Sequence, residues 1–243
     1  MFKASKYFNK ENRYFELLFE GEEYVWNGLK NLKSAIKKTI NPNTANIKKT
    51  GFMVSATTEL KNSAVIHAGA FLKSDMIEIG PGAVIEPGAF IDGPTVIGKN
   101  TQVRHSAYIR GNVLSGENCV IGHATEVKNS ALLGESKAGH FAYIGDSIIG
   151  SVNLGAGTKL ANLKLTQENV YLKTSGKNID TGLRKIGAIM ADGCETGCNS
   201  VTSPGTIMAK NVLLYPNTTA RGYYEEGTII KLRQEVEKAR KEK

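Results

Sequence analysis

Apolar residues recur every six positions between Ile79 and Gly139. Nine of the eleven positions in this series hold a branched aliphatic residue: Ile79, Ile85, Ile91, Ile97, Val103, Ile109, Ile121, Val127 and Leu133. Ser115 and Gly139 interrupt the series. The position four residues further on holds mostly small residues, from Ala83 to Ala131. A period of six fits neither an α-helix, near 3.6, nor a half-buried strand, near 2.0.

The period of six predicts a mainly β fold, a parallel β-helix built from hexapeptide repeats. Three repeats would close one triangular coil of about eighteen residues, and the aliphatic residues of successive coils would stack into an interior column. Glycine and asparagine near the corners, such as Gly82 and Asn100, accept the positive φ of tight turns. A glycine-rich loop is disfavoured, because a loop has no reason to keep an aliphatic register for ten steps.

The pattern divides the chain into three parts. Residues 1–50 are predicted to form a helical cap over the first cross-section of the β-helix, ending at Asn41-Pro42. The apolar stripe of this helix would consist of Tyr24, Trp26, Leu29, Leu32 and Ile36. Residues 51–224 are predicted to form the β-helix, with a polar excursion over 163–185. Residues 225–243 are predicted to form a charged tail with a short terminal helix.

The composition narrows the possible partners and the compartment. Of the 243 residues, 41% are hydrophobic and 22% charged, which is typical of a folded domain, and no run of eighteen apolar residues predicts a membrane span. Three cysteines without a CxxC motif argue against a disulfide framework or a zinc site. With no secretory signal at the N-terminus, the cytoplasm is the expected compartment.

The net charge of +8 is spread along the chain, and the sequence contains no nucleic-acid-binding motif. We therefore expect anionic small molecules, such as sugar phosphates or coenzyme A, as ligands.

The candidate chemistry centres on one histidine and two cations. The four histidines are His67, His105, His123 and His140. His140 lies where Gly139 breaks the aliphatic register, and Tyr143 follows three residues later. Arg110 and Lys128 are eighteen residues apart, so one coil would separate them and the two cations would form a phosphate clamp.

Residues 124–158, and above all the stretch KAGHFAYIGDS, carry a resemblance to a known family. They resemble the acetyltransferase half of the bifunctional N-acetylglucosamine-1-phosphate uridyltransferase and its archaeal-type relatives, the sugar-1-phosphate nucleotidyltransferases with a hexapeptide C-terminal domain. Leu160-Ala-Asn-Leu163 and the segment 180–187 extend the resemblance, which covers residues 65–224.

The resemblance implies a left-handed β-helix that forms a homotrimer, with active sites between protomers. It implies that His140 is the general base, taking a proton from the 2-amino group of the sugar as the nitrogen attacks acetyl-CoA. The implied substrate-binding residues are Arg110, Lys128, Tyr143, Asn153 and, less closely matched, Arg184. The implied coenzyme A contacts are Ala156, Asn162 and Lys231. No metal is implied.

Two departures from the family limit this interpretation. Residues 1–64 contain no glycine-rich nucleotide-binding loop, so nucleotidyltransferase activity is not expected, and His123 stands where the bacterial enzyme has asparagine. The sequence therefore predicts an acetyl-CoA-dependent N-acetyltransferase acting on an amino sugar 1-phosphate. Two alternatives stay open: a catalytically silent trimer that assembles with a separate nucleotidyltransferase, and an acyltransferase acting on a nucleotide-linked sugar.

Overall fold

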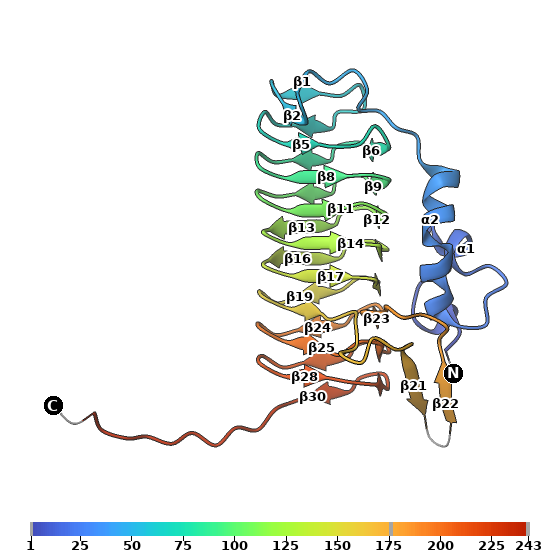
Figure 1. Cartoon of the computed structure of the whole chain (residues 1–243), viewed down its shortest axis with the longest axis vertical. Coiled ribbons are helices and arrows are strands. Elements are labelled where there is room, and N and C mark those ends of the chain that lie inside the picture. The colour runs from blue at the N-terminus through green and yellow to red at the C-terminus, as the bar shows by residue number, and fades with distance from the viewer. Residues whose placement is uncertain (1, 175–176, 242–243) are drawn as a thin grey trace.

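The chain forms a triangular prism of short parallel strands, with helices along one side (Figure 1). The computed structural model describes residues 2–174 and 177–241. Three sheets form the three faces of the prism, and each coil contributes one strand to each sheet. The predicted parallel β-helix is therefore confirmed.

We name the three sheets A, B and C. Sheet A consists of β1 (Lys49–Thr50), β2 (Met53–Val54), β5 (Phe71–Leu72), β8 (Phe90–Asp92), β11 (Tyr108–Arg110), β14 (Glu126–Lys128), β17 (Tyr143–Gly145), β20 (Lys159–Leu160), β25 (Val201–Thr202) and β28 (Thr219–Ala220). Sheet B consists of β3 (Thr58–Glu59), β4 (Val65–Ile66), β7 (Val84–Ile85), β10 (Gln102–Val103), β13 (Val120–His123), β16 (Lys137–His140), β19 (Asn153–Leu154), β24 (Glu195–Thr196), β27 (Leu213–Leu214) and β30 (Ile229–Ile230). Sheet C consists of β6 (Ile77–Ile79), β9 (Thr95–Ile97), β12 (Val113–Ser115), β15 (Ser130–Leu132), β18 (Ile148–Ile149), β23 (Ala188–Met190), β26 (Thr206–Met208) and β29 (Tyr223–Tyr224).

The six-residue pattern corresponds to the interior of the prism. Gln102 in β10 pairs with Val120 in β13, which is eighteen residues further on, the predicted length of a coil. The aliphatic series is buried as predicted, but its last member, Leu133, does not point into the interior of the prism. Leu132 belongs to the interior cluster, whereas Leu133 packs in the cluster that contains the helices. The next coil is one residue shorter, with Val120 paired to Lys137, and this deletion shifts the register.

Sheet C is buried on both faces, because helices cover its outer side. Its outward-facing apolar residues are Val96, Leu114, Ala131, Ile148, Ile189 and Ile207. The covering elements are η1 (Ala4–Lys6), α1 (Phe15–Phe19), η2 (Val25–Asn27) and α2 (Gly28–Thr39). The predicted position of the helices over the first coil is therefore wrong. A sheet face this apolar must be covered, and the N-terminal segment covers it along the side of the prism (Figure 1).

Helix α2 lies directly on sheet C. Leu29, Leu32 and Ile36 of the predicted stripe are buried on it. Gly28 allows the close approach, because a methyl group there would lie 2.5 Å from Phe19 Cε1 and 2.9 Å from Ile148 Cδ1. The helix ends at Thr39, shortly before Pro42, as the sequence predicted.

The segment before the first full coil covers the N-terminal end of the prism. Ile47 and Val54 join the interior cluster, and Leu60 packs against it. At the other end, the predicted terminal helix is wrong: residues 231–241 contain neither helix nor strand and extend away from the prism (Figure 1). Leu232 and Val236 are exposed there, and a short helix without a packed apolar face is unstable in water.

The polar excursion of the sequence contains an antiparallel hairpin of β21 (Tyr171–Thr174) and β22 (Lys177–Asp180). A bridge between Leu163 and Lys185 joins the base of the excursion. Val170 and Leu172 pack into the cluster that contains the helices. Within residues 2–174 and 177–241, no helix has the length and apolar character needed to cross a membrane.

Candidate functional site

Three histidines lie at one edge of the prism, which we call the B–A corner because the chain there passes from sheet B to sheet A. His123 and His140 are register partners in adjacent coils. The rings of His105 and His123 are stacked, with centroids 5.4 Å apart, and the Phe141 ring meets His123 edge-on at 5.1 Å. All three histidines are at the surface rather than inside the prism, and His140 is exposed.

His140 differs from its neighbours in its hydrogen bonds. The Nδ1 atom of His105 lies 2.9 Å from the carbonyl oxygen of Pro87, and that of His123 lies 3.1 Å from the carbonyl oxygen of His105. In the described part of the chain, no hydrogen bond engages the His140 ring. An imidazole can accept a proton only through an unoccupied ring nitrogen. His105 is engaged at both ring nitrogens, because its Nε2 lies 3.1 Å from Ser106 Oγ, whereas His123 keeps a free Nε2. His123 and His140 can therefore both accept a proton, and His140 is the more exposed of the two.

Two cations lie side by side on the outer face of sheet A. Arg110 ends β11 and Lys128 ends β14, and these strands are paired through Ile109 and Val127. Arg110 Nη1 lies 2.8 Å from Glu126 Oε1, and this hydrogen bond raises the pKa of the guanidinium. The structure therefore brings Arg110 and Lys128 together as predicted from their spacing.

A pocket of about 530 Å³ opens beside this cation pair. It lies at the A–C corner, where the chain passes from sheet A to sheet C. Its lining residues are Lys33, Gly93, Pro94, Arg110, Gly111, Asn112, Lys128 and Asn129. Lys33 comes from α2, so the helical segment contributes a third cation to the pocket.

A buried network of carboxamides and one carboxylate supports the pocket. Lys128 Nζ lies 3.4 Å from Asp146 Oδ2, and Asp146 is only 5% exposed. Asn129 Nδ2 donates to Asp146 Oδ1 at 2.6 Å, and Asn162 Nδ2 donates to Asp146 Oδ2. The predicted coenzyme A contact Asn162 is thus part of the support for Lys128.

Tyr143 begins β17, between the two corners. A methyl group at Gly145 would lie 2.6 Å from the Tyr143 hydroxyl and 2.8 Å from Asn162 Nδ2. The Tyr143 hydroxyl therefore lies over Gly145, the register partner of Lys128. Burial and the carboxylates of Glu126 and Asp146 raise the pKa of Tyr143, which keeps its hydroxyl protonated at neutral pH.

Within one chain, His140 and the cation pair lie at opposite ends of a sheet A strand. His140 is at the B–A corner, whereas Arg110 and Lys128 lie toward the A–C corner. The pocket lining includes both cations but not His140. These residues therefore border one outer face of the prism, with Tyr143 between them, and do not converge in a single pocket of the isolated chain.

The other predicted residues lie in several places. Asn153 begins β19 on sheet B and is exposed. Ala156 lies at the B–A corner one coil beyond His140, and the neighbouring Gly157 amide donates to the His140 carbonyl oxygen at 3.0 Å. Arg184 lies in the excursion, where its Nη2 donates to Gln167 Oε1 at 2.6 Å. Lys231 follows β30, with its ammonium 4.9 Å from the centre of the Tyr215 ring.

Two residues of the site were not found from the sequence. Lys33 looked like one of several lysines on the solvated face of a helix, and only the packing of α2 on sheet C brings it to the pocket. Asp146 was missed because this coil is one residue shorter than the repeat: Gly145 is the register partner of Lys128, and Asp146 is the residue after it. In residues 2–174 and 177–241, no group of three histidine, cysteine or acidic residues is arranged to hold a metal ion.

Comparison with known proteins identifies the family. The family described as the GMPPB C-terminal domain matches residues 91–224, more than half of the chain. The chain belongs to this family.

Curated relatives support the same assignment. A bifunctional sugar-1-phosphate nucleotidylyltransferase/acetyltransferase of Sulfurisphaera tokodaii is 37% identical over 98 residues, covering 40% of this chain and 24% of that protein. A bifunctional protein GlmU of Methanococcus maripaludis is 32% identical over 102 residues, covering 42% of this chain and 25% of that protein. The resemblance seen in the sequence is confirmed. The chain spans about a quarter of the length of these relatives.

Two solved structures are similar to the chain at low sequence identity and low TM-score. UDP-N-acetylglucosamine acyltransferase from Campylobacter jejuni is 14% identical, with a TM-score of 0.29, and the match covers 68% of this chain and 69% of that one. GDP-perosamine N-acetyl transferase from Caulobacter crescentus, solved with CoA and GDP-perosamine, is 16% identical, with a TM-score of 0.21, over 65% of this chain and 53% of that one.

Proposed function

We propose that the chain is an acetyl-CoA-dependent N-acetyltransferase that acts on an amino sugar 1-phosphate, with His140 as the general base. The observation that carries the proposal is the exposed imidazole of His140, which has no hydrogen bond among the described residues, on the prism edge beside a face that bears paired cations. The Sulfurisphaera tokodaii relative, which is named as a nucleotidylyltransferase/acetyltransferase, supports the reaction class.

The proposed chemistry needs only one proton acceptor. The sugar amino nitrogen attacks the thioester carbonyl carbon of acetyl-CoA, so that a C–N bond forms as the C–S bond breaks. His140 takes the proton that the nitrogen loses, and the coenzyme A thiolate leaves and is protonated. This route requires neither a covalent acyl-enzyme nor a metal, and the cysteines have no role in it.

The acceptor would be anchored through its phosphate. Arg110 and Lys128 offer adjacent positive charges, and a guanidinium binds phosphate oxygens in a bidentate manner. The protonated Tyr143 hydroxyl lies between these cations and His140 and is suited to donate to the phosphate or the sugar. Asn153 and Arg184 remain further predicted contacts, although Arg184 is already bonded to Gln167 within the excursion.

Acetyl-CoA would lie along the B–A corner. Ala156 occupies this corner one coil beyond His140, which suits a thioester next to the base. Lys231 follows the sheet B strand four coils beyond His140, about 19 Å at the usual spacing between strands. An extended pantetheine arm spans such a distance, so that Lys231 would meet a phosphate of coenzyme A. Asn162 is a weaker candidate contact, because its amide is engaged by Asp146.

The proposal includes a homotrimer. Helices cover the outer face of sheet C, so the uncovered faces of the prism are those of sheets A and B, which meet at the His140 corner. A second chain packed at this corner would enclose His140 and shield the reaction from water. Three free cysteines fit a reducing compartment, and we place the protein in the cytoplasm.

A second candidate acceptor is a nucleotide-linked amino sugar. The Phe90 and Tyr108 rings lie 5.5 Å apart on the outer face of sheet A, and Tyr108 is 44% exposed. Tyr108 shares β11 with Arg110, so a nucleobase stacked on the tyrosine would place its phosphates near the cations. This aromatic column is the observation that favours the second candidate.

The test is release of free coenzyme A from acetyl-CoA with three acceptors: glucosamine, glucosamine 1-phosphate and a uridine-diphosphate-linked amino sugar. The proposal predicts the highest kcat/KM with glucosamine 1-phosphate. A preference for the nucleotide-linked sugar would favour the second candidate. Absence of turnover with all three, together with co-purification of a nucleotidyltransferase, would instead favour the assembly role.

A further inference from the structure

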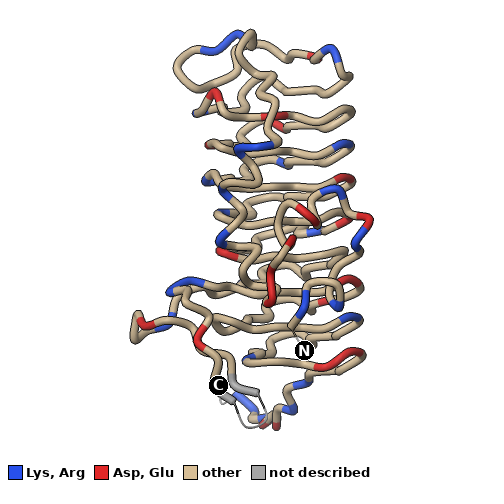
Figure 2. Tube along the Cα trace, turned by 90° about the vertical axis from the view of Figure 1, so that its right-hand side faces the viewer, with Lys and Arg blue, Asp and Glu red and all other residues tan. Residues whose placement is uncertain are grey.

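The pocket at the A–C corner carries more positive charge than the predicted phosphate clamp alone. Its lining holds three cations, Lys33, Arg110 and Lys128, and no carboxylate. The carboxylates lie behind the lining, where Glu126 is paired with Arg110 and Asp146 with Lys128. Basic and acidic residues are otherwise interspersed along the coils (Figure 2).

The excess charge of the pocket rests on Lys33. Glu126 and Asp146 neutralise the two cations of sheet A. Asp92, the register partner of Arg110, is itself paired with Lys73 at 2.8 Å. No ion pair involves Lys33 in the described part of the chain. Removing the Lys33 ammonium would therefore bring the charge of this group of residues to zero.

The packing of α2 explains why Lys33 reaches this corner. The helix contacts β12 and β15, and these strands begin immediately after Arg110-Gly111-Asn112 and Lys128-Asn129. Leu32, the residue before Lys33, is fully buried against sheet C and fixes the rotation of the helix. The position of Lys33 is thus set by a buried neighbour and not by chance contact of a flexible segment.

Two carboxamides, those of Asn112 and Asn129, add neutral polar groups to the lining. Asn112 Nδ2 donates to Asn129 Oδ1 and so joins the two coils beside the pocket. The lining therefore combines three cations with neutral polar groups, which suits an anion such as a phosphorylated sugar.

We propose that Lys33 is the third cation of a phosphate-binding pocket, which thereby includes the N-terminal helical segment. The assignment of Arg110 and Lys128 rests on the proposed function, whereas the role of Lys33 does not. Lys33 lies outside residues 91–224, which the family match covers. The preference of the pocket for phosphorylated ligands would thus depend on Lys33 as well as on residues of the matched β-helix.

Calorimetric titration of the full chain with inorganic phosphate tests this proposal at fixed ionic strength. We expect Lys33→Met to weaken binding about tenfold, the loss typical of one charge-assisted hydrogen bond. Lys37→Met is the matched control, because Lys37 lies on the same exposed side of α2 and does not line the pocket. Its affinity should stay at the wild-type value. Equal affinities of Lys33→Met and wild type would overturn the proposal.

Two further titrations identify the source of the phosphate. A tenfold loss in Lys33→Met for glucosamine 1-phosphate, with coenzyme A unaffected, assigns the pocket to the acceptor. The reverse result assigns it to the cosubstrate and still supports Lys33 as the third cation. Phosphate binding that depends on Lys33 in a protein without acyl transfer would leave this inference standing while the proposed function fails.

Discussion

The Lys128 ammonium lies 3.4 Å from the Asp146 carboxylate, which is almost completely buried one coil further along the prism. Asn129 and Asn162 donate to the two oxygens of this carboxylate from either side. Because these two hydrogen bonds fix the Asp146 carboxylate, its contact with the ammonium holds Lys128 in one orientation, toward the pocket. Asp146 is thus a positioning residue for the cation pair.

Replacing Asp146 with asparagine should destabilise the protein. One oxygen would become an NH2 group facing an amide donor of Asn129 or Asn162, and Lys128 would lose its counter-ion. We expect a loss of about 2 kcal/mol in the free energy of unfolding, measured by chemical denaturation. The control is Glu126→Gln, where an exposed ion pair should cost about 0.5 kcal/mol. Equal effects of the two changes would contradict the buried network.

The spacing between coils limits the side chains that fit near His140. Gly122 lies directly against the backbone of Gly139 in the next coil, and a methyl group on Gly122 would overlap the Gly139 carbonyl. A methyl group on Gly139 meets nothing within 4 Å. The two glycines are thus a matched pair on adjacent strands with opposite tolerance.

Gly122→Ala should therefore lower the free energy of unfolding by about 3 kcal/mol, because the strands must move apart. Gly139→Ala should change it by less than about 0.5 kcal/mol. Thermal and chemical denaturation at one protein concentration measure both. If Gly122→Ala proved as stable as the wild type, the register of His123 against His140 would be wrong.

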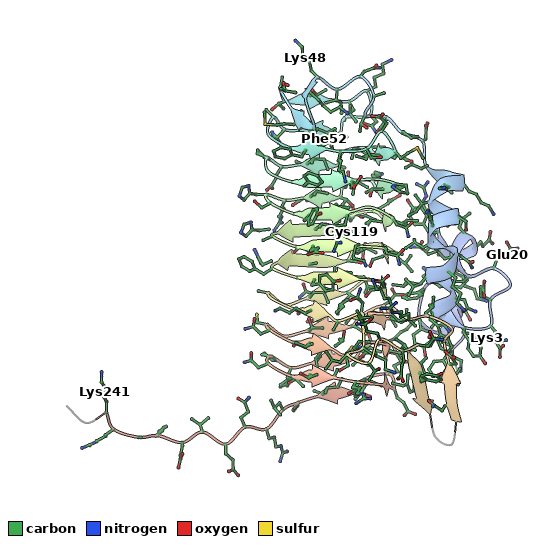
Figure 3. All side chains as sticks on the ribbon, viewed as in Figure 1. Lys3, Glu20, Lys48, Phe52, Cys119 and Lys241 are labelled. Carbon is green, nitrogen blue, oxygen red and sulfur yellow. The ribbon has the colours of Figure 1, made fainter. Side chains whose placement is uncertain are left out.

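The cysteines give a pH-dependent test of the fold. Burial raises the pKa of the Cys194 thiol to about 11 and also raises that of Cys119, which lies inside the prism (Figure 3), whereas Cys198 is exposed. With a pKa near 11, only about one Cys194 in a thousand is a thiolate at pH 8, and the thiolate is the reactive form. The reactive fraction rises as the pH approaches 11.

We therefore expect iodoacetamide at pH 8 to modify Cys198 and to leave Cys119 and Cys194 unmodified until the chain is denatured. Peptide mass spectrometry locates the modified residues. Rapid modification of Cys194 in the native protein at pH 8 would mean that the last coils are not packed as described.

The sequence predicted the prism but not what surrounds it. The six-residue series from Ile79 to Val127 follows directly from stacking identical coils, so one column of residues was enough to define the interior. The prediction placed the helices over the first coil, because it considered only the inward-facing series and not the outward-facing residues of sheet C. Leu114 and Ile148 belong to a second apolar column on the outer face of sheet C. Its eighteen-residue spacing is hard to recognise in the sequence, because some coils are shorter than eighteen residues.

In the candidate site too, the sequence predicted the residues placed by the repeat and missed those placed by packing of other elements. Arg110 and Lys128 were paired correctly, because the repeat converts a sequence distance into a spatial neighbour. Lys33 could not be placed, since its position depends on how α2 docks on the prism. The terminal helix failed because Leu232 and Val236 find no surface to pack against, and a helical pattern of this length does not persist alone.

The central claim is that His140 accepts the proton in acyl transfer. The most direct measurement is kcat for coenzyme A release with glucosamine 1-phosphate in wild type, His140→Ala and the control His105→Ala, which removes another exposed histidine of the same corner. The account predicts a loss of about a hundredfold or more in His140→Ala and a kcat close to wild type in His105→Ala. Undiminished turnover in His140→Ala would contradict it.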